Sequence, residues 1–315
     1  NMLDHIKNKE LGNHILYLSE KINSISEKKF FFILQIDLKK NTFNILKYGA
    51  DTINKICNEW EHMIINEYDN VKIKIFIKEV IKTLNLSEAL NIDKELIIIP
   101  NKILSNIPFS LISNFKANLS YWPNLSLTSR VKISKHLKKE VDIYYDQNED
   151  NAVKEMNVIK KECDKNFKIN TQKIKMINSN SAIIHCVCHF NGNDIIIDGK
   201  NINYKNVFEK ISSKNKIVIL NMCKGSSNLI KNNIYDSIPL FLILKGVQTI
   251  ICHRWDLGQK ASLSFSKLYY KNLNNCNNIN YIFNDALQSM QNHKFIEYGG
   301  YTLWGNNKIG IENGY

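Results

Sequence analysis

The 315-residue chain has little glycine and little proline, with 12 and 4 residues respectively. Helices and strands must therefore be located from hydrophobic periodicity, and no Pro/Gly/Ser-rich linker marks a domain boundary. The chain also lacks a run of about 18 apolar residues, which argues against a membrane-spanning helix, and its N-terminus lacks the apolar stretch of a signal peptide. These absences favour a globular protein without a membrane partner.

The cysteines do not form a disulfide framework. There are seven, an odd number without framework spacing, and a chain of this length buries an adequate core without disulfide bonds. Free thiols of this kind are typical of a reducing compartment. We therefore predict a cytoplasmic protein.

Positive charge is in excess, since 42 Lys and Arg against 30 Asp and Glu give a net charge of +12. Asn, Lys and Ile are all abundant, as the codons of an AT-rich genome produce, so much of the basicity requires no binding partner. The sequence has no Gly-rich phosphate loop, no basic run interleaved with aromatic residues and no Cys/His finger spacing. We expect nucleic acid to be an indirect partner at most.

Hydrophobic periodicity divides the chain into two halves, residues 1–150 and 151–315. The first half contains a predicted hairpin (30–38 with 42–46), two helices (51–68 and 71–86) and a buried strand (96–99). In the second half, strands at 182–188, 216–222 and 249–252 alternate with helices at 151–166, 204–210, 236–245, 259–273 and 281–292. This alternation predicts an α/β fold, with a mostly parallel sheet flanked by helices. The polar segment 135–155 is expected to be a surface connection.

Two reactive side chains follow two successive strands of the second half. His189 follows the strand at 182–188, and Cys223 follows the strand at 216–222. If these strands are neighbours, both residues emerge at the carboxyl edge of the sheet, where functional groups collect. An imidazole beside a thiol favours the nucleophilic thiolate. The backbone N–H groups of Phe190 and Cys223 could then form an oxyanion hole.

Other interpretations of the same residues remain open. A cysteine at the end of an apolar strand is often a small buried hydrophobe, and a histidine near a turn is often structural. His185, Cys186, Cys188 and His189 are also of the types that bind zinc. Strand alternation separates the two histidines from the two cysteines, so we predict no metal and no cofactor, with His185 in a supporting role and the cysteines packed beneath a helix.

Eight segments, together with the Asn-Met-Cys-Lys-Gly element around Cys223, occur in an order that resembles a known family. They are residues 96–111, 119–127, 184–190, 219–225, 239–255, 265–273, 284–291 and 298–306. Their order resembles that of the CHAT domain, a caspase-like cysteine peptidase domain that is related to separase and often joined to tetratricopeptide repeats. The similarity extends over nearly the whole chain.

The resemblance implies a caspase-hemoglobinase fold in which the first half is a degenerate caspase-like unit without catalytic residues. It implies a cysteine endopeptidase with Cys223 as nucleophile and His189 as base. It also implies regulation by an activating sensor or repeat-containing partner protein, and cleavage of a specific protein substrate, as in a bacterial defence or cell-death pathway.

Two positions depart from the family pattern. The family has Gly directly after the catalytic His, where this chain has Phe190, and a side chain there restricts φ. Relatives place an acidic residue four positions after Trp255 to recognise a basic P1 side chain, but that residue here is Gln259. The P1 pocket candidates are therefore Trp255, Asp256, Gln259 and Asp194, with Asp198 as a further acid.

The same departures support a different class of function. Phe190 and Lys224 could mark a decayed site in a catalytically inactive caspase-like module that binds other proteins. Such a module would form a complex with its partner, and no thiol reagent would label Cys223 under activating conditions.

Overall fold

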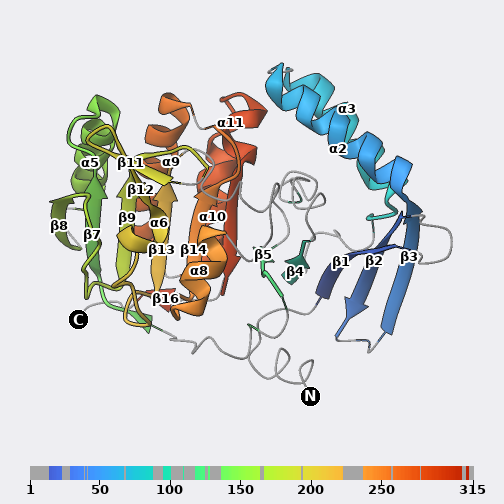
Figure 1. The fold of residues 1–315 in the computed structure, drawn as a ribbon, viewed down its shortest axis with the longest axis horizontal. Helices are drawn as coiled ribbons and strands as arrows, with labels where there is room; N and C mark the ends of the chain where they lie inside the picture. The colour runs from blue at the N-terminus through green and yellow to red at the C-terminus, as the bar shows by residue number, and fades with distance from the viewer. Residues whose placement is uncertain are drawn as a thin grey trace.

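The computed structural model describes most of the chain (Figure 1). The described residues are 14–22, 29–38, 40, 42–66, 69–87, 95–100, 109, 118–124, 127, 136–163, 167–192, 194–222, 237–256, 258–276, 278–306 and 310–311. Cys223 and Lys224 lie outside them.

Eleven of the described strands form one sheet that runs through both halves of the chain (Figure 1). They are β1 (His14–Ile22), β2 (Lys29–Asp37), β3 (Thr42–Gly49), β4 (Glu95–Ile99), β5 (Asn118–Tyr121), β7 (Glu140–Tyr145), β8 (Lys168–Lys173), β9 (Ile183–Val187), β13 (Ile217–Asn221), β14 (Thr249–His253) and β15 (Tyr301–Gly305). Their order is β3-β2-β1-β4-β5-β15-β14-β13-β9-β7-β8. Most neighbours are parallel; the antiparallel pairs are β1–β2, β2–β3 and β14–β15.

The C-terminal strands form the buried part of this sheet that the sequence predicted. Every residue of β9, β13 and β14 is buried, as expected for parallel strands with both faces covered. Their helices are α5 (Asp150–Cys163), α6 (Tyr204–Val207), α8 (Ile238–Leu244), α9 (Gln259–Asn275), α10 (Ile279–Ser289) and α11 (Phe295–Gly299). Helix α9 packs against both α5 and α10. The predicted α/β alternation is therefore confirmed.

The N-terminal strands carry two helices, α2 (Ala50–Ile65) and α3 (Asn70–Thr83), which lie together above β1 to β3 in Figure 1. The predicted β2–β3 hairpin and both helices are confirmed. Asp69 sets the start of α3, because its carboxylate accepts hydrogen bonds from the N–H groups of Val71 and Lys72, both at 2.9 Å.

The prediction that residues 135–155 are a surface connection was wrong. The segment contains β7, which pairs with β8 and β9, and buries Val141, Ile143 and Tyr144. The charged Asp142 interrupts the apolar pattern of this strand, so the sequence did not predict it. Asp142 is nevertheless buried, because Ser179, Ser181 and Asn170 donate hydrogen bonds to its carboxylate. Both neighbours of β7 in the sheet, β8 and β9, belong to the C-terminal half. We therefore propose that the boundary between the two halves lies between β5 and β7 rather than at residue 150.

Two smaller sheets complete the described structure. The first contains β10 (His189–Phe190), β11 (Asp194–Ile197) and β12 (Lys200–Asn203), and the second contains β6 (His136–Leu137) and β16 (Gly310–Ile311). The three-stranded sheet begins with His189, one of the candidate residues from the sequence.

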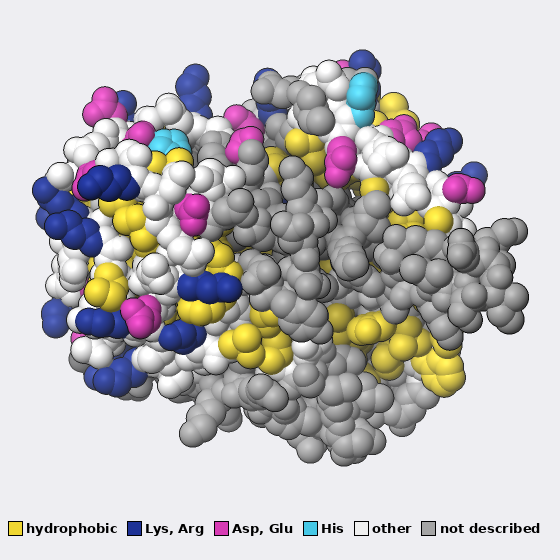
Figure 2. Space-filling view, in the orientation of Figure 1, with side chains coloured by type: hydrophobic (Ala, Val, Ile, Leu, Met, Phe, Trp, Pro, Cys, Tyr) yellow, Lys and Arg dark blue, Asp and Glu magenta, His cyan; other side chains and the backbone are white. Residues whose placement is uncertain are grey.

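The surface in Figure 2 has Lys and Arg side chains spread over the C-terminal half, with Asp and Glu side chains among them. Among the described side chains on this face, the pattern contains no continuous basic stripe. Within the described residues, no helix combines the length and apolar character that crossing a membrane requires.

An aromatic cluster joins α2 and α3 to the end of β14. The buried Trp60 of α2 stacks on Phe76 of α3, with ring centroids 5.8 Å apart, and makes an edge contact at 5.8 Å with Trp255, which follows β14. One hydrophobic cluster of described residues runs through both halves of the chain. The halves therefore share a core.

We expect Trp60→Ala to lower the free energy of unfolding by about 3–5 kcal/mol, because it removes a buried aromatic side chain at this junction. Chemical denaturation measures the change. The control is Phe43→Ala on β3, where the side chain is 72% exposed and a change within about 0.5 kcal/mol is expected. Equal effects of the two substitutions would contradict the assignment of Trp60 to the shared core.

Candidate active site

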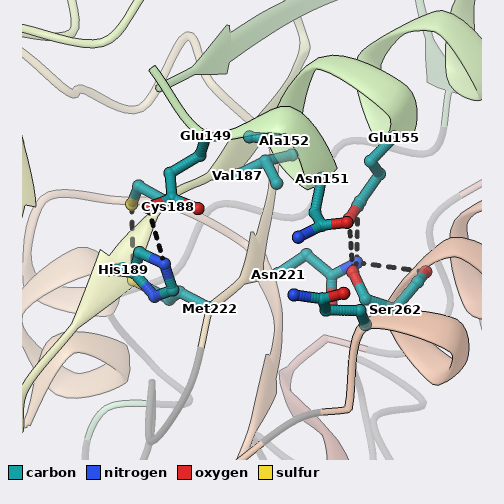
Figure 3. A pocket seen from close by; sticks show the side chains of 11 residues that line it. Glu149, Asn151, Ala152, Glu155, Val187, Cys188, His189, Asn221, Met222 and Ser262 are labelled. Atoms are coloured by element: carbon teal, nitrogen blue, oxygen red, sulfur yellow. Dashed lines mark hydrogen bonds and ion pairs between the residues drawn. The ribbon is translucent and has the colours of Figure 1, made fainter. Parts of the chain in front are cut away.

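The candidate site lies where β9 and β13 end side by side. The two strands are parallel neighbours, and Val187 at the end of β9 pairs with Asn221 at the end of β13. A pocket with about 480 Å³ of empty space, part of it open to solvent, lies at these ends (Figure 3). Its lining residues are Glu149, Asn151, Ala152, Glu155, Val187, Cys188, His189, Asn221, Met222, Gln259 and Ser262.

His189 is at the rim of this pocket with its side chain 55% exposed. Its Nε2 atom lies 3.1 Å from Oε1 of Glu149, which precedes α5. Met222 also lines the pocket and directly precedes Cys223, which is outside the described residues. Cys188 is buried as expected, but it faces this pocket, with its Sγ 3.9 Å from the Met222 Sδ. The pocket lining therefore contains a thiol as well as the imidazole.

Phe190 avoids the backbone strain that the sequence suggested. It lies in strand β10 with its side chain buried, and the positive φ of the loop falls on Gly192, at 100°. The Asn191 N–H donates to the Asp194 carbonyl at 3.1 Å. Since hydrogen-bonded pairs alternate in an antiparallel ladder, the next pair, Phe190 with Ile195, is a non-hydrogen-bonded one. The N–H of Phe190 consequently faces away from β11.

A buried carboxylate forms the opposite side of the pocket (Figure 3). Glu155 of α5 is 1% exposed, and side chains from three other elements surround it. His185 Nε2 of β9 is 3.0 Å from Glu155 Oε1, and the Asn221 amide of β13 donates to the same oxygen at 2.5 Å. Ser262 and Ser266 of α9 donate to Oε2 and Oε1 respectively. We call these five residues the Glu155 cluster.

The Glu155 cluster keeps its carboxylate ionised. Burial by itself raises the pKa of Glu155, but the His185 imidazole and the hydroxyls of Ser262 and Ser266 outweigh burial and hold the pKa below its ordinary value of 4.5. Two tyrosines extend the cluster. Tyr270 OH lies 3.0 Å from His185 Nδ1, and Tyr301 OH donates to the Asn221 side chain at 2.7 Å. The supporting role predicted for His185 agrees with these contacts.

The P1 candidates from the sequence differ in whether they line the pocket. Gln259, the first residue of α9, lines it. Trp255 is half-buried and Asp256 is exposed, and neither is among the described lining residues, nor is Asp194 on β11. Asp198 instead accepts a hydrogen bond from the Asn148 amide at 2.6 Å.

A buried histidine fixes the backbone beside Trp255. The ring nitrogens of His253 face the carbonyl oxygens of Trp255, at 2.7 Å, and Glu297, at 3.0 Å. Burial lowers the pKa of His253 to about 4, although both carbonyls act in the opposite direction. His253 therefore connects the end of β14 to α11 rather than facing the pocket.

Neither Glu149 nor Glu155 was identified from the sequence. Glu155 did have a signal, because it occupies the buried stripe of α5 with Ala152, Ile159 and Cys163 at helical spacing. A charge in an apolar stripe indicates a buried partner. Glu149 had no such signal, since its contact with His189 spans 40 residues and depends on the position of β7. Among the described residues, no three His, Cys, Asp or Glu are grouped as metal ligands.

Comparisons with known proteins give similarity in fold without similarity in sequence. No family model matches the chain, and no curated protein does. Two crystal structures of the Saccharomyces cerevisiae separase–securin complex match with TM-scores of 0.62 and 0.63 at 8% and 9% identity. The matches cover 99% and 98% of this chain but only 31% of the separase chain. A structure described as a protease matches with a TM-score of 0.50 at 10% identity, over 76% of this chain and 69% of that one.

The fold is thus a mixed α/β fold of the caspase-like class, as the sequence predicted. Within that class the similarity is to separase, and this chain spans about a third of the separase chain that it matches. The resemblance to the CHAT domain in particular has no matching family model.

Glu155→Gln tests whether the buried carboxylate supports the site. We expect the free energy of unfolding near neutral pH to fall by about 3–5 kcal/mol, because a buried charge network loses its central partner. The pKa of Glu155 is lower in the folded state, so its contribution is present above about pH 4.5 and is lost as the pH falls below that value. The difference between parent and variant should therefore shrink on acidification. Denaturation from about pH 7 to about pH 2.5 measures it.

Glu149→Gln is the matched control for this experiment, because Glu149 lines the same pocket but its side chain is 38% exposed. Its effect on stability should stay within about 1 kcal/mol. A Glu155→Gln variant as stable as this control would mean that the cluster does not depend on the carboxylate.

Proposed function

We propose that the chain is a regulated cysteine endopeptidase that cleaves a protein substrate through Cys223 and His189. The observation that carries this proposal is the pairing of β9 with β13, which brings His189 and Met222 to one pocket. Cys223 is the next residue after Met222. The caspase-like protease fold shared with separase supports the same reaction class.

In the proposed reaction, the Cys223 thiol gives its proton to the His189 imidazole, and the thiolate attacks the carbonyl carbon of the scissile peptide bond. The tetrahedral oxyanion is stabilised by the N–H groups of Cys223 and Phe190. The orientation of the Phe190 N–H away from β11 supports its part in this role. The imidazolium then protonates the leaving amine, and water hydrolyses the thioester.

The proposal includes control by another protein. The two separase structures are complexes with securin, and we infer a protein partner for this chain as well, of the sensor or repeat-containing kind that CHAT domains use. We propose that β1 to β5 form a degenerate caspase-like half and that the strands from β7 onwards form the catalytic half. We further propose that the peptidase is cytoplasmic and that its partner regulates it in a defence or cell-death pathway.

Substitution of either proposed catalytic residue tests the reaction. We expect Cys223→Ala and His189→Ala each to lower cleavage of a peptide library by at least about 10³-fold, since the two groups act as a unit. Mass spectrometry of the products measures the rate. Cys188→Ser is the matched control, because it removes the other pocket thiol and should leave cleavage and labelling of Cys223 by a thiol reagent intact.

Unchanged cleavage by the Cys223→Ala and His189→Ala variants would overturn the assignment. If the parent is neither cleaving nor labelled at Cys223 under any activating condition, the chain is the inactive protein-binding module instead.

We also propose that the substrate carries a basic P1 residue and that the Asp256 carboxylate recognises it. The other pocket candidates are Trp255, Gln259 and Asp194. Asp256→Asn should lower the preference for Arg or Lys at P1 by about tenfold, the effect of about 1.4 kcal/mol of charge attraction. Product sequences from the library measure it, and Asp194→Asn is the matched control. Loss of the preference in the Asp194 variant alone would assign the pocket to Asp194.

A further inference from the structure

A half-buried carboxylate contacts the proposed catalytic histidine at the rim of the pocket (Figure 3). Glu149 Oε1 lies 3.1 Å from His189 Nε2, with the two side chains 38% and 55% exposed. We propose that Glu149 is a positioning residue for His189, which holds the neutral imidazole as the Nε2–H tautomer and leaves Nδ1 to exchange protons. This inference rests on the proposed function.

The turn that carries Glu149 is tied to the end of β9. The Asp146 N–H donates to the Val187 carbonyl at 3.0 Å, two residues before His189. Within the turn, the Glu149 N–H donates to the Asp146 carbonyl at 3.3 Å, and the Asn148 N–H donates to the Asp146 carboxylate at 3.0 Å. The backbone of Glu149 is therefore fixed relative to the strand that leads into His189.

The same turn is tied to the small sheet that contains His189. The Asn148 amide donates to Asp198 Oδ1 at 2.6 Å, and Asp198 joins β11 to β12. Since β11 pairs with β10, both ends of the Glu149–His189 contact belong to one hydrogen-bonded assembly. A carboxylate held in this way meets the geometric requirement for orienting a catalytic base.

A contribution to stability does not account for this contact. Exposed pairs contribute about 0–1 kcal/mol, and the backbone hydrogen bonds hold the turn without the Glu149 side chain. The effect of the carboxylate is on the imidazole itself. Because Nε2–H donates to Glu149, the proton from the Cys223 thiol goes to Nδ1, and Nδ1 later returns it to the leaving amine.

The tautomer of His189 is the direct test. In protein with ¹⁵N-labelled histidine, the His189 signals are assigned by their loss in His189→Gln. We expect the Nε2–H tautomer in the parent and in Glu149→Gln, whose amide oxygen still accepts, and a mixture of tautomers in Glu149→Ala. Glu209→Gln, which removes an exposed charge elsewhere, is the control. An unchanged tautomer in Glu149→Ala overturns the inference.

The kinetic test uses the peptide cleaved best by the parent. We expect Glu149→Ala to lower kcat by about 10–100-fold, as loss of an orienting partner does, with KM unchanged and partial rescue by Glu149→Gln. Full kcat in Glu149→Ala overturns the inference. The NMR measurement does not require peptidase activity. If the tautomer changes in Glu149→Ala but the parent has no peptidase activity, the positioning role of Glu149 stands and only the proposed function is rejected.

Discussion

The structure around the candidate site depends on the burial of one ionised carboxylate. A buried charge is costly unless donors surround it, and the donors to Glu155 come from β9, β13 and α9 while Glu155 itself is on α5. These elements must therefore meet at one point. That point lies at the ends of β9 and β13, so a single electrostatic requirement fixes one side of the pocket.

The two carboxylates of the pocket have different physical roles because they differ in burial. Glu155 is enclosed, and its removal affects stability through unpaired partners. Glu149 is half-buried, is expected to contribute little to stability and contacts the His189 imidazole at the pocket rim. The pocket therefore has a buried, hydrogen-bonded cluster on one side and an accessible histidine on the other.

This chain and yeast separase share a fold at very low sequence identity. A chain 8–9% identical to yeast separase has the same caspase-like arrangement, because continuous apolar runs such as β9 and β13 specify buried parallel strands without specifying particular side chains. Periodicity alone accordingly predicted β2, β3, β4, β9, β13, β14 and their helices. It failed for β7, where Asp142 interrupts the apolar run and is buried only because Ser179, Ser181 and Asn170 from distant segments donate to it.

The sequence by itself determined the α/β alternation and the position of His189 at the end of a buried strand. These properties depend on local periodicity, which a single segment carries. Only the tertiary structure decided which strands are neighbours, that β7 joins the C-terminal sheet, and that Glu149 and Glu155 flank the pocket. Their partners lie from 30 to 111 residues away, and contacts at such separations are set by the packing of whole elements rather than by any local pattern.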